Sequence, residues 1–201
     1  MVKVMLFDFG GVLGNNDNEW KTTFIEISDV TGLTSKELDE LFFTRWPELK
    51  VGTKDVSYVW ELISANSKKS VDPIKLEEIY ENNICVDKVV IEIAIKLKNS
   101  DYQMAILANA AKRWMDVKIE KFNLNKIFEK IYSSADLGMK KPDLNVYEHV
   151  IKDLNVAPEE ILFIDNLERN TLVAEKLGIK CIVFKNAEQL KEDLEKFGIK
   201  V

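Results

Sequence analysis

The chain has 201 residues, of which 46% are hydrophobic and 31% are charged, and its formal net charge is −6. This length is enough to bury a sizeable core in one or two domains. The acidic balance argues against nucleic acid and anionic membranes as main partners. No apolar run reaches the roughly 18 residues of a membrane span, and no signal-peptide cleavage pattern is seen. We therefore expect a soluble, cytoplasmic protein.

Five short apolar runs predict strands, at residues 2–7, 103–107, 130–134, 161–165 and 180–184. Segments with helical periodicity separate or follow the later runs, at 111–122, 143–155, 168–178 and 186–197. Strands that alternate with helices of this length are typical of a parallel sheet with right-handed crossovers. The predicted fold class is therefore α/β, with a Rossmann-like parallel sheet flanked by helices.

Residues 15–86 break this alternation with about four helical segments, near 18–31, 35–48, 55–66 and 73–82. The sequence TSKE at 34–37 is typical of a capping box. A helical block directly after the first strand should lie over that strand's carboxyl end, where open α/β sheets bind ligands. We predict a core domain of residues 1–14 and 87–201 and an inserted helical cap domain of residues 15–86. Three tryptophans of the insert are expected mainly in the core of its helical bundle: Trp20, Trp46 and Trp60.

Four polar segments fall at or just beyond predicted strand ends. Asp8 follows the first strand and LANAA (107–111) the second, GMKKPD (138–143) precedes the helix after the third, and FIDNLERN (163–170) ends the fourth. Adjacent parallel strands bring their carboxyl ends to one edge of the sheet, so these segments should meet in one crevice under the insert.

The chemistry of these segments suits phosphoryl transfer. A carboxylate can attack a phosphoryl group to form an aspartyl-phosphate, and the reaction calls for a nearby lysine and a divalent cation. Magnesium prefers one or two carboxylates among its oxygen ligands, and Asp8 and Asp165 could supply them. The two glycines after Asp8, Gly10 and Gly11, would let the loop turn a backbone carbonyl toward a metal and N–H groups toward phosphate.

Taken in order, FDFGGVL, ILANA, GMKKPD and FIDNLERNTLVAEKLG, with a helical insert after the first, resemble the haloacid dehalogenase-like hydrolases. The similarity is greatest to the phosphatase-type branch that includes the amino-terminal domain of soluble epoxide hydrolase, and it covers nearly the whole chain. The stretch LKVGTKDVSYVWELI (49–63) also resembles the cap helices of that branch. The resemblance implies a magnesium-dependent phosphatase acting on a small phosphorylated metabolite.

The resemblance also implies a role for each matching residue. Asp8 would be the nucleophile, and Lys141 the catalytic lysine. Magnesium would be held by Asp8, the carbonyl of Gly10, Asp165 and Asn166. The residues expected to bind substrate are Gly11, Asn109, Ala110 and Lys141.

Three positions depart from the family pattern. Gly10 stands where an aspartate usually acts as general acid and base, Ala108 where a hydroxyl binds phosphate, and Asn166 where an acid binds metal. Asp17 could replace the missing acid, although a solvated loop position is expected for it. Losing proton transfer costs roughly 10²–10⁴ in rate. A slow phosphatase and a catalytically impaired binding module therefore both fit the sequence.

Two other functions are disfavoured. Dehalogenases of the family work without metal and have a tyrosine at the position of Gly10. Receiver domains use a similar aspartate, lysine and magnesium, but they lack a large insert and a Lys-Pro of this kind. The lone histidine, His149, is expected at the surface. The sequence identifies neither the substrate nor an oligomeric state.

Overall fold

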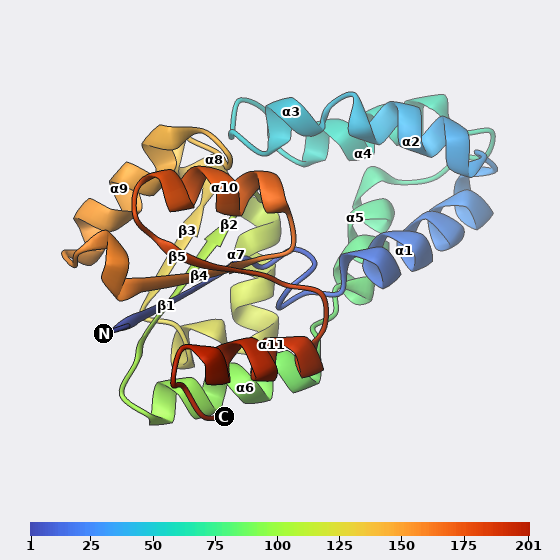
Figure 1. Ribbon diagram of the computed structural model, residues 1–201. Helices are drawn as coiled ribbons and strands as arrows, with labels where there is room; N and C mark the ends of the chain where they lie inside the picture. The colour runs from blue at the N-terminus through green and yellow to red at the C-terminus, as the bar shows by residue number, and fades with distance from the viewer.

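The computed structural model describes residues 1–201 apart from the side chains of Asn16 and Asp17, so Asp17, the candidate replacement acid, lies outside the described side chains. Within the described chain, five strands form one parallel sheet in the order β3-β2-β1-β4-β5. They are β1 (Val4–Phe7), β2 (Gln103–Ala108), β3 (Lys130–Ser133), β4 (Ile161–Asp165) and β5 (Lys180–Val183). The predicted α/β fold class is confirmed (Figure 1).

Helices cover both faces of the sheet: α6 (Lys88–Asn99), α7 (Lys112–Phe122), α9 (Leu144–Leu154), α10 (Glu168–Lys176) and α11 (Ala187–Lys196). Successive strand residues point to opposite faces. Met5 and Phe7 pack on the side of α6, α7 and α11, whereas Val4 and Leu6 pack on the side of α9 and α10. Strand β1 is therefore buried on both faces, as its unbroken apolar run predicts. Figure 1 shows α6 and α11 below the strands and α9 and α10 above them.

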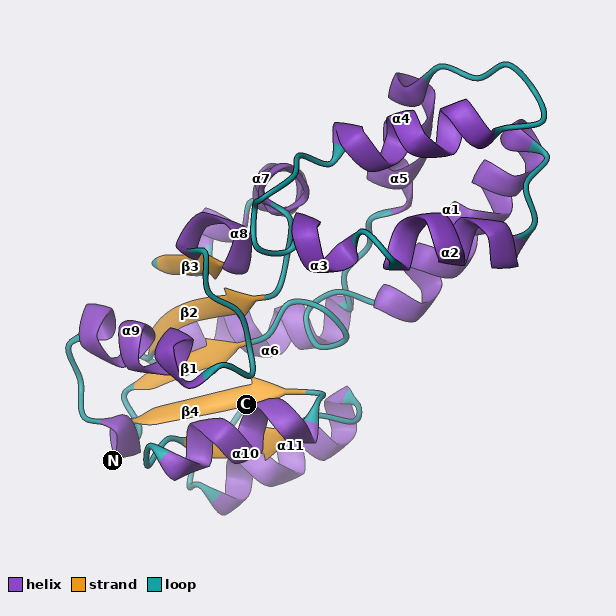
Figure 2. Ribbon diagram, turned by 90° about the horizontal axis from the view of Figure 1, so that it is seen from above, coloured by secondary structure: helices purple, strands orange, loops and turns teal.

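The first five helices after β1 precede α6, and we call them the helical insert: α1 (Asn16–Thr31), α2 (Ser35–Phe43), α3 (Trp46–Leu49), α4 (Ser57–Asn66) and α5 (Pro73–Asn83). Figure 2 shows the insert projecting beyond the ends of the strands. It has its own apolar core, in which Trp60 is buried, while Trp20 and Trp46 are partly buried against it. Trp114 of α7 joins this core and stacks on Phe42, with ring centroids 5.6 Å apart, so aromatic packing links the insert to the sheet.

Two backbone segments connect the insert to the sheet, and they lie side by side. Gly14 forms an antiparallel bridge with Val86, and the Asp87 N–H donates to the Leu13 carbonyl at 2.8 Å. The insert is therefore held to the rest of the chain at two adjacent crossings as well as at Trp114.

The structure corrects two predicted boundaries. The predicted helix at 35–48 is broken into α2 and α3, because Pro47 lacks the N–H that would continue the hydrogen-bond ladder of α2, and it is accommodated in the first turn of α3. The predicted strand at 130–134 ends at Ser133, whose hydroxyl accepts from the Asp136 N–H and caps the short helix α8 (Ser134–Leu137). Two 3₁₀ turns also occur, η1 (Leu124–Lys126) and η2 (Pro158–Glu160).

Helix α6 is absent from the sequence-based prediction. Its run VVIEIAI is rich in β-branched residues, which favour strands. Asp87 nevertheless caps a helix here by accepting from two backbone N–H groups, and the buried residues have helical spacing: Val90, Ile93, Ala94 and Leu97. His149 is exposed, as expected. Among the described helices, none has the length and apolar content that crossing a bilayer requires.

The predicted capping box is present at the start of α2. The Thr34 hydroxyl accepts from the Glu37 N–H at 3.3 Å, and the Glu37 carboxylate accepts from the Thr34 N–H at 2.6 Å. Hydrogen bonds from the Thr34 backbone and hydroxyl, together with Lys68, lower the pKa of Glu37 from 4.5 to about 2. This box fixes the first turn of the second helix of the insert.

We expect Thr34→Ala to lower the free energy of unfolding by about 1 kcal/mol, because two helix-terminal contacts are lost. The control Ser35→Ala, in the same exposed turn, should change it by less than about 0.5 kcal/mol. Urea denaturation measures both. Folding lowers the pKa of Glu37, so its contribution is complete above about pH 4.5 and is lost as the pH falls toward 2. The loss of unfolding free energy caused by Thr34→Ala should therefore become smaller as the pH falls from about 4.5 toward 2. An unchanged denaturation midpoint of Thr34→Ala at neutral pH would contradict the role of the capping box.

Candidate active site

Two carboxylates leave the sheet side by side. Phe7 of β1 pairs with Ile164 of β4 in parallel register, so the residues that follow, Asp8 and Asp165, lie next to each other. The Asp8 N–H donates to the Ile164 carbonyl at 2.8 Å, which extends the pairing by one residue. The strand order reverses between β1 and β4, and open α/β sheets bind ligands at such a point.

Lys141 lies between these two carboxylates. Its Nζ is 2.8 Å from Asp8 Oδ1 and 2.7 Å from Asp165 Oδ2. Lys141 is 3% exposed, Asp8 6% and Asp165 0%. One buried ammonium therefore faces two buried carboxylates, and the group carries net negative charge when all three are ionised.

The environment of Asp8 disfavours its charged form. Burial raises the pKa of Asp8 from 3.8 to about 6 and Asp165 adds to the rise, while Lys141 and the Phe9 N–H act in the opposite direction. The Phe9 N–H donates to Asp8 Oδ1 at 2.6 Å. Among the described residues, none donates a hydrogen bond to Oδ2. Oδ2 is therefore available to react or to bind a ligand, whereas Oδ1 is held by the Phe9 N–H and Lys141.

Protein donors engage both oxygens of Asp165. The Leu167 N–H donates to Oδ1 at 2.8 Å, and Asn170 Nδ2 lies 3.0 Å from Oδ1 and 2.9 Å from Oδ2. Lys141 donates to Oδ2. This carboxylate therefore holds both Lys141 and the start of α10. The sequence analysis assigned no role to Asn170, although it lies only five residues after Asp165 in the same segment.

Asn109 fixes the backbone of Lys141. Its Nδ2 donates to the Lys141 carbonyl at 2.8 Å, and the Lys141 N–H donates to its Oδ1 at 2.9 Å. This reciprocal pair ties the segment that carries Lys141 to the end of β2. Asn109 also lines the pocket at Asp8, but its side-chain amide is engaged by protein rather than free for substrate.

Two residues expected to bind substrate do not line the pocket that contains Asp8. The Ala110 N–H donates to Ser134 Oγ at 3.1 Å and is thereby occupied. Gly11 has a φ of +77°, and a Cβ there would lie 2.4 Å from the amide nitrogen of Asn166. The positive φ therefore favours glycine at position 11, and any side chain there would displace the Asn166 amide. Ala110 and Gly11 line neighbouring cavities.

A pocket of ≈ 390 Å³ opens at Asp8 and Lys141, and this volume is in the range of small-molecule sites. Gly10 contributes to its lining from the end of β1, and Trp46 and Lys50 contribute from the helical insert. The sequence reading placed Trp46 in the bundle core and made no assignment for Lys50. Their position depends on how the insert docks, which no local pattern in the sequence reports.

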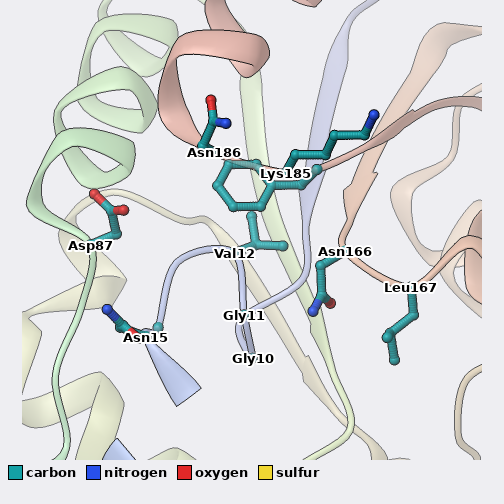
Figure 3. Close-up of a pocket in the computed structure, with 11 residues that line it drawn as sticks. Gly10, Gly11, Val12, Asn15, Asp87, Asn166, Leu167, Lys185 and Asn186 are labelled. Carbon is teal, nitrogen blue, oxygen red and sulfur yellow. The ribbon is translucent and has the colours of Figure 1, made fainter. Parts of the chain in front are cut away.

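A larger pocket of ≈ 610 Å³ adjoins the first at Gly10. Figure 3 shows Asn166 reaching toward the Gly10–Gly11 turn, with Asn15 and Asp87 across the pocket. Asn166 Oδ1 is buried and has no hydrogen-bond partner among the described residues. The described side chains contain no group of three or more His, Cys, Asp or Glu residues suited to a metal. A cation at Asp8 would therefore draw on carbonyl and amide oxygens as well.

The chain matches the family model of the haloacid dehalogenase-like hydrolases over residues 5–184. It belongs to this family. The family resemblance drawn from the strand-end motifs is thereby confirmed. Residues Asp8, Lys141 and Asp165 all lie within the matched part of the chain.

Known relatives include phosphatases. D-ribitol-5-phosphate phosphatase of Bacteroides thetaiotaomicron is 25% identical over 205 residues, which cover 96% of this chain and 97% of that protein. Bifunctional epoxide hydrolase 2 of Mus musculus is 25% identical over 118 residues, or 55% of this chain and 21% of that protein. The matches to four other curated relatives span only 27% to 42% of their lengths.

Among solved structures, a HAD family enzyme from Bacteroides thetaiotaomicron in complex with magnesium and inorganic phosphate superposes with a TM-score of 0.72. It is 24% identical, and the match covers 92% of this chain and 95% of that one. The two chains therefore share their fold over nearly their whole length.

We expect Lys141→Met to lower the free energy of unfolding by roughly 3–5 kcal/mol at pH 7.5, because two buried carboxylates would lose their shared cation. Urea denaturation in the presence of a metal chelator measures this. Lys141 lowers the pKa of Asp8, so its removal raises that pKa further, and protonation of Asp8 at pH 5 should recover part of the loss. The control is Lys140→Met, at a half-buried neighbour paired with Asp143. It should lower the free energy of unfolding by no more than about 1 kcal/mol. Equal small losses in the two variants would contradict this account.

Proposed function

We propose that this protein is a magnesium-dependent phosphatase-type hydrolase of a small phosphorylated metabolite. The observation that carries the proposal is the buried Lys141 ammonium between Asp8 and Asp165, at the border of a pocket sized for a small molecule. Membership of the family and the phosphatases among its relatives support the same reading.

In this proposal Asp8 Oδ2 attacks the phosphorus of the ester. The bond between phosphorus and the leaving-group oxygen breaks, and the leaving group departs with the electron pair and takes a proton from water. A second water then attacks the phosphorus of the aspartyl-phosphate, which releases phosphate and restores the Asp8 carboxylate. Lys141 offsets negative charge on the phosphoryl oxygens and holds Asp8 in place.

The residues around Asp8 fit a magnesium ion. Two buried carboxylates face one ammonium, and a divalent cation would offset the excess negative charge. The buried, unpartnered Asn166 Oδ1 is an oxygen of the kind that magnesium prefers. Asp8, the Gly10 carbonyl and Asn166 would hold the ion. The sequence-based set also includes Asp165, whose oxygens already accept from protein donors, so Asp165 would act through Lys141. The bound ion would stabilise charge on the transferred phosphoryl group.

We further propose that the helical insert acts as a cap, with residues 1–14 and 87–201 as the core domain and residues 15–86 as the cap domain. Trp46 and Lys50 of the insert line the same pocket as Asp8, which supports a cap that contributes to the substrate site. The side-by-side backbone crossings at Gly14 and Val86 support a boundary at these positions.

The second candidate function is a binding module that keeps an anion pocket without efficient turnover. The departures at Gly10, Ala108 and Asn166 favour it, because together they remove a proton donor, a phosphate hydrogen bond and a metal charge. The Asp8–Lys141–Asp165 group would still bind a phosphorylated ligand in such a protein.

We expect the wild-type protein to hydrolyse p-nitrophenyl phosphate in the presence of magnesium and to stop when the metal is chelated. Asp8→Asn should lower kcat by at least roughly 10³-fold, because the nucleophile is lost. Asp39→Asn, at an exposed position on α2, should leave kcat unchanged. If calorimetry detects phosphate binding but the wild type shows no turnover, the phosphatase proposal is wrong and the binding module is favoured.

We expect Gly10→Asp to raise kcat for alkyl phosphate esters, because the new carboxyl can protonate the leaving-group oxygen. The expected gain is about 10²-fold or more, within the range of general acid catalysis. The gain should be much smaller for p-nitrophenyl phosphate, whose leaving group needs little protonation. In the described turn the positive φ belongs to Gly11 rather than Gly10, so the variant should fold, which a thermal melt checks. A well-folded Gly10→Asp protein that gains nothing, even with Ala108→Ser and Asn166→Asp, would count against the phosphatase proposal.

A further inference from the structure

Three cationic side chains line the pocket that contains Asp8 and Lys141: Lys50, Lys140 and Arg169. We call them the cationic mouth. They come from different parts of the fold, since Lys50 follows α3 of the insert, Lys140 precedes α9 and Arg169 lies in the first turn of α10. The chain as a whole carries a net charge of −6. This local gathering of positive charge therefore runs against the overall composition.

Protein groups leave much of this charge unbalanced. Within the described residues, no carboxylate lies within 4.0 Å of Lys50 or Arg169, and only Lys140 is paired, with Asp143 at 2.6 Å. Burial lowers the pKa of Lys50, and the nearby Lys140 and Arg169 lower it further, while Asp143 opposes them. Arg169 also stands at a helix amino end, where the helix dipole disfavours a cation. The arrangement is unfavourable for the free protein, and a bound anion would relieve it.

The backbone of Lys50 is docked on the sheet side of the molecule. Its carbonyl accepts a hydrogen bond from the Ser134 hydroxyl, which in turn accepts from the Ala110 N–H at 3.1 Å. Two residues later, Gly52 has a φ of +73° and lies so close to Ala135 that a Cβ would be 2.7 Å from the Ala135 carbonyl oxygen. Lys50 is therefore brought to the pocket by a fitted contact between the insert and the sheet.

We infer that the substrate carries a second anionic group, a carboxylate or a second phosphate, which the cationic mouth binds while the phosphate to be cleaved lies at Asp8 and Lys141. This inference rests on the proposed phosphatase function. The two anion positions differ in depth. Asp8 and Lys141 are buried, whereas Lys50 and Lys140 are half-buried and Arg169 is exposed. A pocket of ≈ 390 Å³ has room for a small molecule with an anionic group at each end.

The chemistry of the three side chains suits such a group. The guanidinium of Arg169 can donate two parallel hydrogen bonds to a carboxylate or phosphate, and the two ammonium groups act as point charges beside it. Lys141 and the proposed metal already offset the charge of the transferred phosphate. The cations of the mouth are therefore available to the leaving group, and they determine which esters bind.

The test compares three matched esters: glycerol 1-phosphate, 3-phosphoglycerate, which has a carboxylate in place of one hydroxymethyl group, and glycerol 1,3-bisphosphate. We expect the wild type to prefer at least one of the two esters with a second anion by about tenfold or more in kcat/KM, mainly through KM. Lys50→Met and Arg169→Met should each lower that preference by roughly tenfold. Arg169→Glu should lower it further, because it reverses the charge. Whichever of 3-phosphoglycerate and glycerol 1,3-bisphosphate has the lower KM identifies the second group as carboxylate or phosphate.

A matched control removes a positive charge from the same helix outside the pocket. Lys176→Met, in the last turn of α10, should leave both kcat/KM and the preference unchanged. Turnover of p-nitrophenyl phosphate and a thermal melt establish that each variant is folded.

Three results would overturn the inference. The first is a wild type that shows no preference among the esters. The second is a set of mouth variants that slow all three esters equally, which would mean that the cations only attract the transferred phosphate. If the wild type turns over none of the esters nor p-nitrophenyl phosphate, the phosphatase proposal fails separately. In that case calorimetry with the same three esters tests whether the cationic mouth binds a second anion. Equal affinities for all three esters would be the third result that overturns the inference.

Discussion

The Lys141 ammonium lies 2.8 Å from Asp8 and 2.7 Å from Asp165, and all three side chains are almost completely removed from water. Burying an ion costs several kcal/mol unless it is paired and hydrogen-bonded. Each carboxylate meets this requirement differently. Asp165 is engaged by Lys141, Asn170 and a backbone N–H, whereas Asp8 Oδ2 receives no hydrogen bond from the residues that the structure describes. Asp165 is thus the structural partner of the lysine, which is consistent with Asp8 as the proposed nucleophile.

The parallel register of β1 with β4 is what makes this group possible. A shift of one residue would turn every side chain of a strand to the other face of the sheet, and Asp8 would no longer leave the sheet beside Asp165. The third strand involved is β2, where Asn109 holds the backbone of Lys141 through two hydrogen bonds. Three strand ends therefore set the positions of three charges, and the apolar packing on both faces of the sheet keeps the strands in register.

Local patterns were enough to predict the strands, the parallel α/β fold and the meeting of Asp8 and Asp165, because each depends on an apolar run and on where it ends. The place of Lys141 beside them was predicted from the family resemblance. Features that depend on tertiary contacts were missed. Helix α6 was not predicted, because its β-branched residues do not favour a helix, yet Asp87 and one buried face make it helical. The engagement of Asn109 with Lys141 joins residues 32 positions apart. Lys50 and Arg169 look like solvated surface charges until the docked insert places them around one pocket.

Two of the departures from the family pattern meet in one place, because Gly10 and Ala108 both line a cavity of ≈ 60 Å³ bordered by Trp20, Tyr80 and Trp114. Space and aromatic surface are found there, where the family usually has an acid and a hydroxyl. With glycine rather than an acid at position 10, the rate of the proposed cleavage would depend on how well the leaving-group oxygen carries negative charge by itself. The proposed cationic mouth acts on the rest of the leaving group through binding. In the proposed phosphatase the two features would constrain the substrate independently, since glycine at position 10 would affect kcat and the mouth would affect KM.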